Sequence, residues 1–112
     1  MAAERKRRGS MGNYDMITRL EEIIAGRKSE MPEGSYTTYL FTQGQDKILK
    51  KVGEEAAETI IASKNDNRTE LVYEASDLIY HLLVLLAHHE ISWAEIEAEL
   101  ERRYIGGMKD EG

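Results

Sequence analysis

Two pairs of acidic residues have the spacing that chemistry at a metal ion would need. Glu55 and Glu58 are three positions apart, and Glu74 and Asp77 repeat that spacing later in the chain. Residues three apart share one face of a helix, so each pair can point two carboxylates the same way. The strong break between the pairs is Asn65–Asn67, and both pairs are symmetric about position 66.

A chain that folds back at this break would place Glu58 level with Glu74, and Glu55 level with Asp77. The four carboxylates would then converge between two antiparallel helices, where they repel one another unless a cation binds them. The sequence has no cysteine, and oxygen ligands of this kind favour Mg²⁺ or Mn²⁺. We therefore expect a divalent metal site at this hairpin.

The first pair also has a simpler interpretation. Acidic residues three apart, such as Glu55 and Glu58, are common on solvated helix faces, whereas the second pair lies in a strongly apolar helix, where unpaired carboxylates are costly. Lys50 and Lys51 lie one turn before the first pair. As surface lysines they need no explanation, but beside a metal they can hold the outer phosphates of a polyphosphate. Carboxylates, a metal and lysines together indicate phosphoryl chemistry.

Apolar residues recur with helical periodicity in four segments, at about 13–25, 45–63, 67–89 and 92–104. Asn13 or Asp15 is expected to cap the first helix, Gly26 to end it, and a capping box at Ser92 to open the last. Ser35–Phe41 is either a short helix capped by Ser35 or an extended piece. Its hydroxyls suit a loop that contacts a ligand, and a plain connector with packed aromatics fits equally well.

The second and third helices each have an apolar side. The expected core residues of the second helix are Ile48, Leu49, Val52, Ala56, Ile60 and Ser63. Those of the third are Leu71, Val72, Ala75, Ile79, Leu82, Leu83 and Leu86. After His81, which we interpret as a core or supporting residue rather than a ligand, the third helix is apolar nearly all round. One short chain cannot cover such a helix, so we expect a homodimer or higher helical oligomer.

Length and charge restrict the remaining possibilities. The chain has 112 residues and a net charge of -6, which fits one small all-α domain and argues against nucleic acid as a partner. We expect that domain at 13–105, a disordered basic tail or vector-derived remnant at 1–12, and a flexible tail at 106–112. The longest apolar run, Leu82–Ala87, is far below the roughly 18 residues that cross a bilayer. No membrane partner and a cytoplasmic location are expected.

With these residues in view, the sequence resembles phosphoribosyl-ATP pyrophosphohydrolases, which belong to the all-α, MazG-like nucleoside triphosphate pyrophosphohydrolases. The shared signature is Glu-Glu-x-x-Glu followed by Glu-x-x-Asp, which here is Glu54–Glu58 and Glu74–Asp77. Further similar segments are Pro32–Thr37, Asp46–Glu55, Glu70–Glu74 and Asp77–Leu83. The resemblance covers about Ile17 to Tyr104.

This resemblance implies a four-helix-bundle-type domain completed by homodimerisation. It implies hydrolysis of 1-(5-phosphoribosyl)-ATP to 1-(5-phosphoribosyl)-AMP and pyrophosphate, the second step of histidine biosynthesis. Glu55, Glu58, Glu74 and Asp77 would hold Mg²⁺, and Glu54 would be an extra ligand or the base that positions water. The implied substrate contacts are Lys47, Lys50, Lys51, Ser35, Tyr36 and Thr37.

Two other functions remain open at this point. The same metal site would serve a house-cleaning pyrophosphohydrolase that acts on non-standard nucleoside triphosphates. A helical dimerisation module without activity would explain the apolar third helix but not the matching acidic pairs. The chain is also too short to include the cyclohydrolase with which this family is often fused, so that activity is expected elsewhere.

Overall fold

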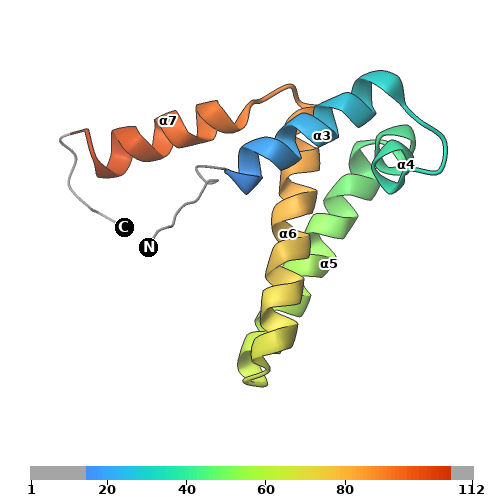
Figure 1. Ribbon diagram of the computed structural model, residues 1–112. Coiled ribbons are helices and arrows are strands. Elements are labelled where there is room, and N and C mark those ends of the chain that lie inside the picture. Colours follow the sequence, from blue (N-terminus) through green and yellow to red (C-terminus); the bar gives the residue numbers. More distant parts are fainter. Residues whose placement is uncertain (1–14, 107–112) are drawn as a thin grey trace, which may run out of the picture.

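The computed structural model describes residues 15–106, and within that range every regular element is an α-helix (Figure 1). The helices are α3 (Met16–Glu30), α4 (Tyr36–Gln43), α5 (Gln45–Lys64), α6 (Arg68–His88) and α7 (Trp93–Tyr104). The predicted all-α class is therefore confirmed. The tail predicted at 1–12, and all of the one predicted at 106–112 except Gly106, lie outside the described residues.

The centre of the structure is an antiparallel hairpin of α5 and α6, which lie side by side along their length in Figure 1. The chain reverses at the predicted break. Asp66 takes a left-handed conformation with φ 54°, which the short polar side chain of aspartate tolerates better than most. Asn67 then caps α6, because its Oδ1 accepts a hydrogen bond from the Glu70 amide at 3.0 Å.

The first helix is longer than the sequence indicated. Asp15 caps it as expected, with Oδ1 accepting from the Ile17 amide at 3.1 Å, but the predicted stop at Gly26 is wrong because α3 continues to Glu30. A glycine inside a helix costs only about 1 kcal/mol, and contacts beyond Gly26 offset that cost. Lys28 Nζ, for example, donates to the Ala87 carbonyl at 2.7 Å.

The segment that the sequence left open is the helix α4. Ser35 caps it by accepting a hydrogen bond from the Thr38 amide at 3.2 Å. Gly44 separates α4 from α5 with φ 95°, a conformation that glycine adopts without strain. The two helices can therefore meet at a sharp angle, and α4 lies across the end of the hairpin that is opposite the turn (Figure 1).

The buried apolar core is small and lies where α3 and α4 meet this end of the hairpin. Its buried members are Ile24, Leu40, Ile48, Leu83 and Val84. Much of the apolar surface predicted for α5 and α6 stays exposed within one chain, including Ile60 at 64% and Val72 at 62%. Of the core residues predicted for α5, Ile48 is buried as expected; the other buried residues are Glu55 and Ala62, and the three are spaced by seven and face α6.

By length and composition alone, α6 would be long and apolar enough to cross a membrane. That is weak support for a membrane span, because a core helix of a soluble protein passes the same test. The buried carboxylate of Glu74 and the buried imidazole of His81 lie on this helix, and both are polar groups that hydrocarbon would strongly disfavour.

Candidate active site

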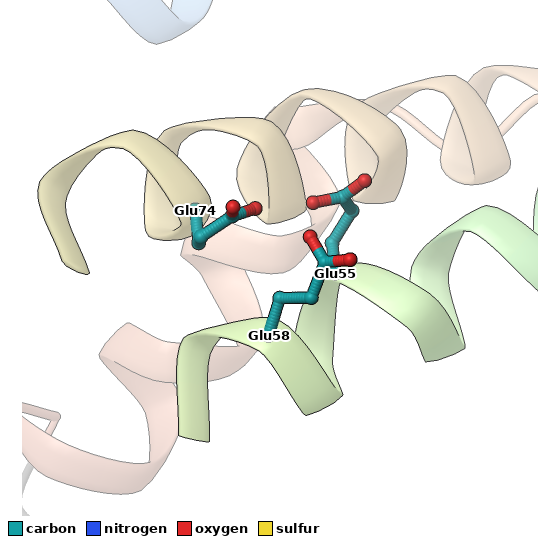
Figure 2. A group of neighbouring side chains, drawn as sticks. All are labelled: Glu55, Glu58 and Glu74. Carbon is teal, nitrogen blue, oxygen red and sulfur yellow. The ribbon is translucent and has the colours of Figure 1, made fainter. Parts of the chain in front are cut away.

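Three carboxylates converge between α5 and α6. One oxygen each from Glu55, Glu58 and Glu74 lies within 4.8 Å of the others, and Figure 2 shows their carboxyl ends directed toward one another from the two helices. Glu55 and Glu74 are buried, at 6% and 7% exposure, and each has a buried oxygen without a hydrogen-bond partner. Unpaired buried carboxylates are costly, so this oxygen-only set fits a hard divalent cation.

The protonation of Glu74 reflects this crowding. The neighbouring carboxyl of Glu55 is the main cause that raises the pKa of Glu74 to about 8, and burial, Glu70 and Glu58 raise it further. Carboxylates carry no hydrogen-bond donor, so two of them can bond only when they share a proton. Without a cation, Glu74 therefore retains a proton near neutral pH, and a bound cation would replace that proton.

Asp77 does not join this group of three, although the sequence predicted that all four carboxylates would converge. A separation of three residues moves a side chain by about 4.5 Å along a helix, and Glu74 already occupies the level of both Glu55 and Glu58. Burial is the main cause that raises the pKa of the Tyr36 and Tyr80 phenols. The charge of Asp77 is a smaller cause that raises both in the same direction.

Lys50 and Lys51 both form ion pairs with Glu54, which is not one of the three converging carboxylates. Lys50 Nζ lies 3.9 Å from Glu54 Oε2, and Lys51 Nζ lies 3.4 Å from Glu54 Oε1. Lys47 is further toward α4, with Nζ 5.7 Å from the centre of the Tyr39 ring. Glu54 thus belongs to an ion-paired surface beside the carboxylate group.

Lys51 connects this surface to the carboxylates and to α4. Burial lowers the pKa of its ammonium, but the bond with Glu54 and the nearby Tyr36 and Glu55 outweigh burial, so that the pKa is raised above its usual value. The side chain is only 30% exposed, against 65% for Lys50. The charged ammonium of Lys51 is therefore partly buried and interacts electrostatically with both Glu55 and Tyr36.

The three hydroxyl residues predicted to contact substrate have different positions. Ser35 is engaged as the cap of α4. Thr37 is buried and its hydroxyl is hydrogen-bonded to the Tyr80 hydroxyl. Tyr36 remains 46% exposed, and its phenol lies within the electrostatic reach of Lys51. Of the three, Tyr36 is thus the side chain that is both exposed and close to the charged groups.

The structure adds Glu70, which was not among the predicted site residues, and buries His81, which the sequence predicted as a core or supporting residue. Glu70 lines a hollow of about 270 Å³ together with Glu58 and Glu74, and its position four residues before Glu74 was the available signal. His81 lies seven residues after Glu74, on the same buried side of α6. A larger hollow of about 470 Å³, beside Lys28 and Trp93, includes none of the predicted site residues.

Most of this chain matches one family of known proteins. Residues 17–104 match the family described as phosphoribosyl-ATP pyrophosphohydrolase. A protein of Pelotomaculum thermopropionicum named phosphoribosyl-ATP pyrophosphatase is 56% identical over 93 residues, which is 83% of this chain and 95% of that protein. A protein of the same name from Listeria welshimeri is 61% identical over 88 residues, 79% of this chain and 84% of the relative.

Other relatives are longer. The histidine biosynthesis bifunctional protein HisIE of Caldanaerobacter subterraneus is 61% identical over 90 residues, which is 80% of this chain but 44% of that protein. The chain also covers 46% of the corresponding Halalkalibacterium halodurans protein, and so spans less than half the length of these two relatives. Because the family match includes α4, α5, α6 and all three converging carboxylates, the chain belongs to the phosphoribosyl-ATP pyrophosphohydrolase family.

Proposed function

We propose that this protein hydrolyses 1-(5-phosphoribosyl)-ATP to 1-(5-phosphoribosyl)-AMP and pyrophosphate, the second step of histidine biosynthesis. The observation that carries this proposal is the convergence of Glu55, Glu58 and Glu74 beside the partly buried ammonium of Lys51, in a chain that matches the family over residues 17–104. Relatives named phosphoribosyl-ATP pyrophosphatase support it.

The cofactor in this proposal is Mg²⁺, with Mn²⁺ as a substitute. Glu55, Glu58 and Glu74 would hold it, since they supply only hard oxygen ligands and two of them have an unpartnered buried oxygen. Asp77, one turn along α6, remains a proposed fourth ligand. When bound, Mg²⁺ would neutralise charge on the phosphates and on the departing pyrophosphate.

The remaining side chains would bind and orient the substrate. Lys51, which is partly buried beside Glu54, would hold a phosphate next to the carboxylates, and Lys50 and Lys47 would extend that positive surface. Glu54 lies outside the group of three, and in this proposal it orients the attacking water or adds a ligand. Tyr36 would border the bound substrate, and Ser35 and Thr37 would shape the turn that presents it.

We also propose that the protein acts as a homodimer in the cytoplasm. Seven large hydrophobic side chains on the described hairpin are at least 39% exposed in one chain: Leu49, Ile60, Ile61, Val72, Tyr73, Ile79 and Leu82. A second copy that packs its own hairpin on this surface would cover them. The net charge of -6 gives no support to a nucleic-acid partner.

The decisive experiment measures pyrophosphate release from phosphoribosyl-ATP, which is made in place from ATP and phosphoribosyl pyrophosphate. We expect turnover with Mg²⁺ and none with excess chelator. ATP, dUTP and oxidised nucleoside triphosphates serve as competing substrates. Faster turnover of a non-standard nucleotide would favour the house-cleaning alternative, and no turnover of any substrate would overturn the proposal.

A further inference from the structure

His81 has a hydrogen-bonding arrangement that fixes its tautomer. Its ring is 3% exposed, and Nδ1 lies 2.9 Å from the Asp77 carbonyl oxygen. A carbonyl oxygen only accepts hydrogen bonds, so Nδ1 carries a proton. When the ring holds that proton alone, Nε2 presents a lone pair, and the Tyr36 hydroxyl, which lies 3.0 Å from Nε2, donates to it.

A second bond lies directly beside this one. The Thr37 and Tyr80 hydroxyls are hydrogen-bonded to each other, so two neighbouring residues of α4 are bonded to two neighbouring residues of α6. The rings also pack together, with centroids 6.2 Å apart for Tyr36 and Tyr80 and 4.9 Å for Tyr80 and His81. The first turn of α4 is thus held on α6 by two side-chain hydrogen bonds and by ring packing.

The Tyr36 phenol is the end of this arrangement that reaches the charged groups. Burial raises the pKa of Tyr36, Lys51 lowers it, and Tyr80, Asp77 and Glu55 raise it again. Lys51 and the carboxylates of Asp77 and Glu55 thus all act electrostatically on the phenol. His81 itself is not among the three converging ligand residues.

We propose that His81 is a positioning residue for substrate binding: by accepting the Tyr36 hydroxyl, it holds the first turn of α4 so that Tyr36 stays beside Lys51. The role in binding rests on the proposed function, whereas the bond itself does not. Because the carboxylates are not touched, loss of the bond should weaken substrate binding more than it slows the chemical step.

The test compares the variants Tyr36→Phe and His81→Asn with the double variant. Asparagine can still donate to the Asp77 carbonyl, but its amide is too short to reach Tyr36. Loss of one hydrogen bond predicts that each single change raises KM about three- to tenfold, with kcat changed less than about twofold. The double variant should be no worse than either single variant, because both remove the same bond.

Two further variants separate positioning from packing. His81→Gln places an amide oxygen near the former Nε2 position and should restore most of the affinity. His89→Asn changes an exposed histidine near the end of the same helix and should leave KM and kcat unchanged. Effects that multiply in the double variant, a His81→Asn variant with normal KM, or failure of His81→Gln to restore KM would overturn the proposal.

The bond can also be tested without turnover. A long-range ¹⁵N–¹H spectrum of the wild-type protein should show His81 as the neutral Nδ1–H tautomer, and the Nε2–H tautomer would contradict the proposal. If phosphoribosyl-ATP proves not to be a substrate, the proposed function fails, and calorimetry with Mg²⁺ and pyrophosphate replaces KM in the same comparison. Equal affinities across the variants, or no binding to the wild type, would then overturn the positioning role.

Discussion

Glu55 of α5 and Glu74 of α6 meet as buried carboxylates across the hairpin, and each has one oxygen without a hydrogen-bond partner. Glu58 supplies a third carboxylate at the more exposed side of the same group. A protein gains nothing in stability from such an arrangement unless a proton or a cation is shared within it. The pair therefore links stability, pH and metal binding, and the first two predictions follow from that link.

The first prediction is that Mg²⁺ stabilises the folded protein. A ligand at 100 times its Kd adds about 2.7 kcal/mol, which for a domain of this size corresponds to a rise in Tm of about 10 °C or more. Thermal unfolding with Mg²⁺ and with chelator measures the shift. Glu74→Gln should lose it, whereas Glu99→Gln, which alters a carboxylate paired with Arg102 and Arg103 on α7, should retain it. An unchanged Tm in Mg²⁺ would favour the non-enzymatic module.

The second prediction concerns pH in the absence of divalent cations. The pKa of Glu74 is raised from the ordinary 4.5 to about 8, so the folded state binds its proton more tightly than the unfolded state. This contribution to stability is complete below pH 4.5 and is lost as the pH rises through 8. Urea unfolding in chelator at several values between pH 5 and 8 should show this decline.

Glu74→Gln is the control for that pH series, because glutamine cannot titrate at this position. The histidines contribute equally to both proteins, so the difference between the two curves isolates Glu74. We expect the wild-type free energy of unfolding to fall with pH relative to that of the variant. Parallel curves would show that Glu74 titrates normally and that the carboxylates do not share a proton.

The third prediction is that each converging carboxylate is essential for turnover. Glu55→Gln and Glu58→Gln should fold, as judged by circular dichroism, but lose more than about 100-fold in kcat/KM, since removal of an outer partner of a metal ligand alone costs about 10- to 100-fold. Asp77→Asn tests the proposed fourth ligand. The control variant Glu97→Gln changes an exposed residue of α7 and should be fully active. Mg²⁺-dependent activity retained by both Glu58→Gln and Asp77→Asn would refute the assigned roles.

The fourth prediction distinguishes two neighbouring lysines. Both lysines pair with Glu54, but Lys51 is 30% exposed and interacts electrostatically with Tyr36 and Glu55, whereas Lys50 is 65% exposed. Lys51→Ala should therefore raise KM for phosphoribosyl-ATP by about tenfold, the scale of a charge-assisted hydrogen bond. Lys50→Ala should change it by less than about threefold. A larger rise in KM for Lys50→Ala than for Lys51→Ala would place the phosphates on the outer side of α5.

The fifth prediction addresses the exposed apolar surface of the hairpin. Val72 is 62% exposed in one chain, and a buried aspartate at this position would disfavour a dimer interface strongly. Val72→Asp should shift the mass measured by sedimentation from dimer toward monomer at equal concentration. Ile105→Asp changes an apolar residue that is 74% exposed at the end of α7, and it should leave the dimer intact. A monomeric wild type would contradict the proposed homodimer.

Much of the local structure could be predicted from sequence because its causes are local. The helical repeat of apolar residues, the caps at Asp15 and Ser92, and the break at Asn65–Asn67 depend on residues within one or two turns. The structure contains these features where the sequence indicated them, including both hydrogen bonds of the capping box between Ser92 and Glu95. The symmetric spacing about position 66 likewise predicted that carboxylates from both helices would meet.

Features that depend on packing between helices were decided only by the tertiary structure. Gly26 continues α3 because contacts beyond it offset a small local cost. Glu55 became a buried residue because α6 packs on the side of α5 that carries it. Spacing gives the direction of a side chain around a helix, but its level against a neighbouring helix depends on the turn and on packing. For this reason Asp77 lies apart from the three converging carboxylates, and His81 is hydrogen-bonded to Tyr36.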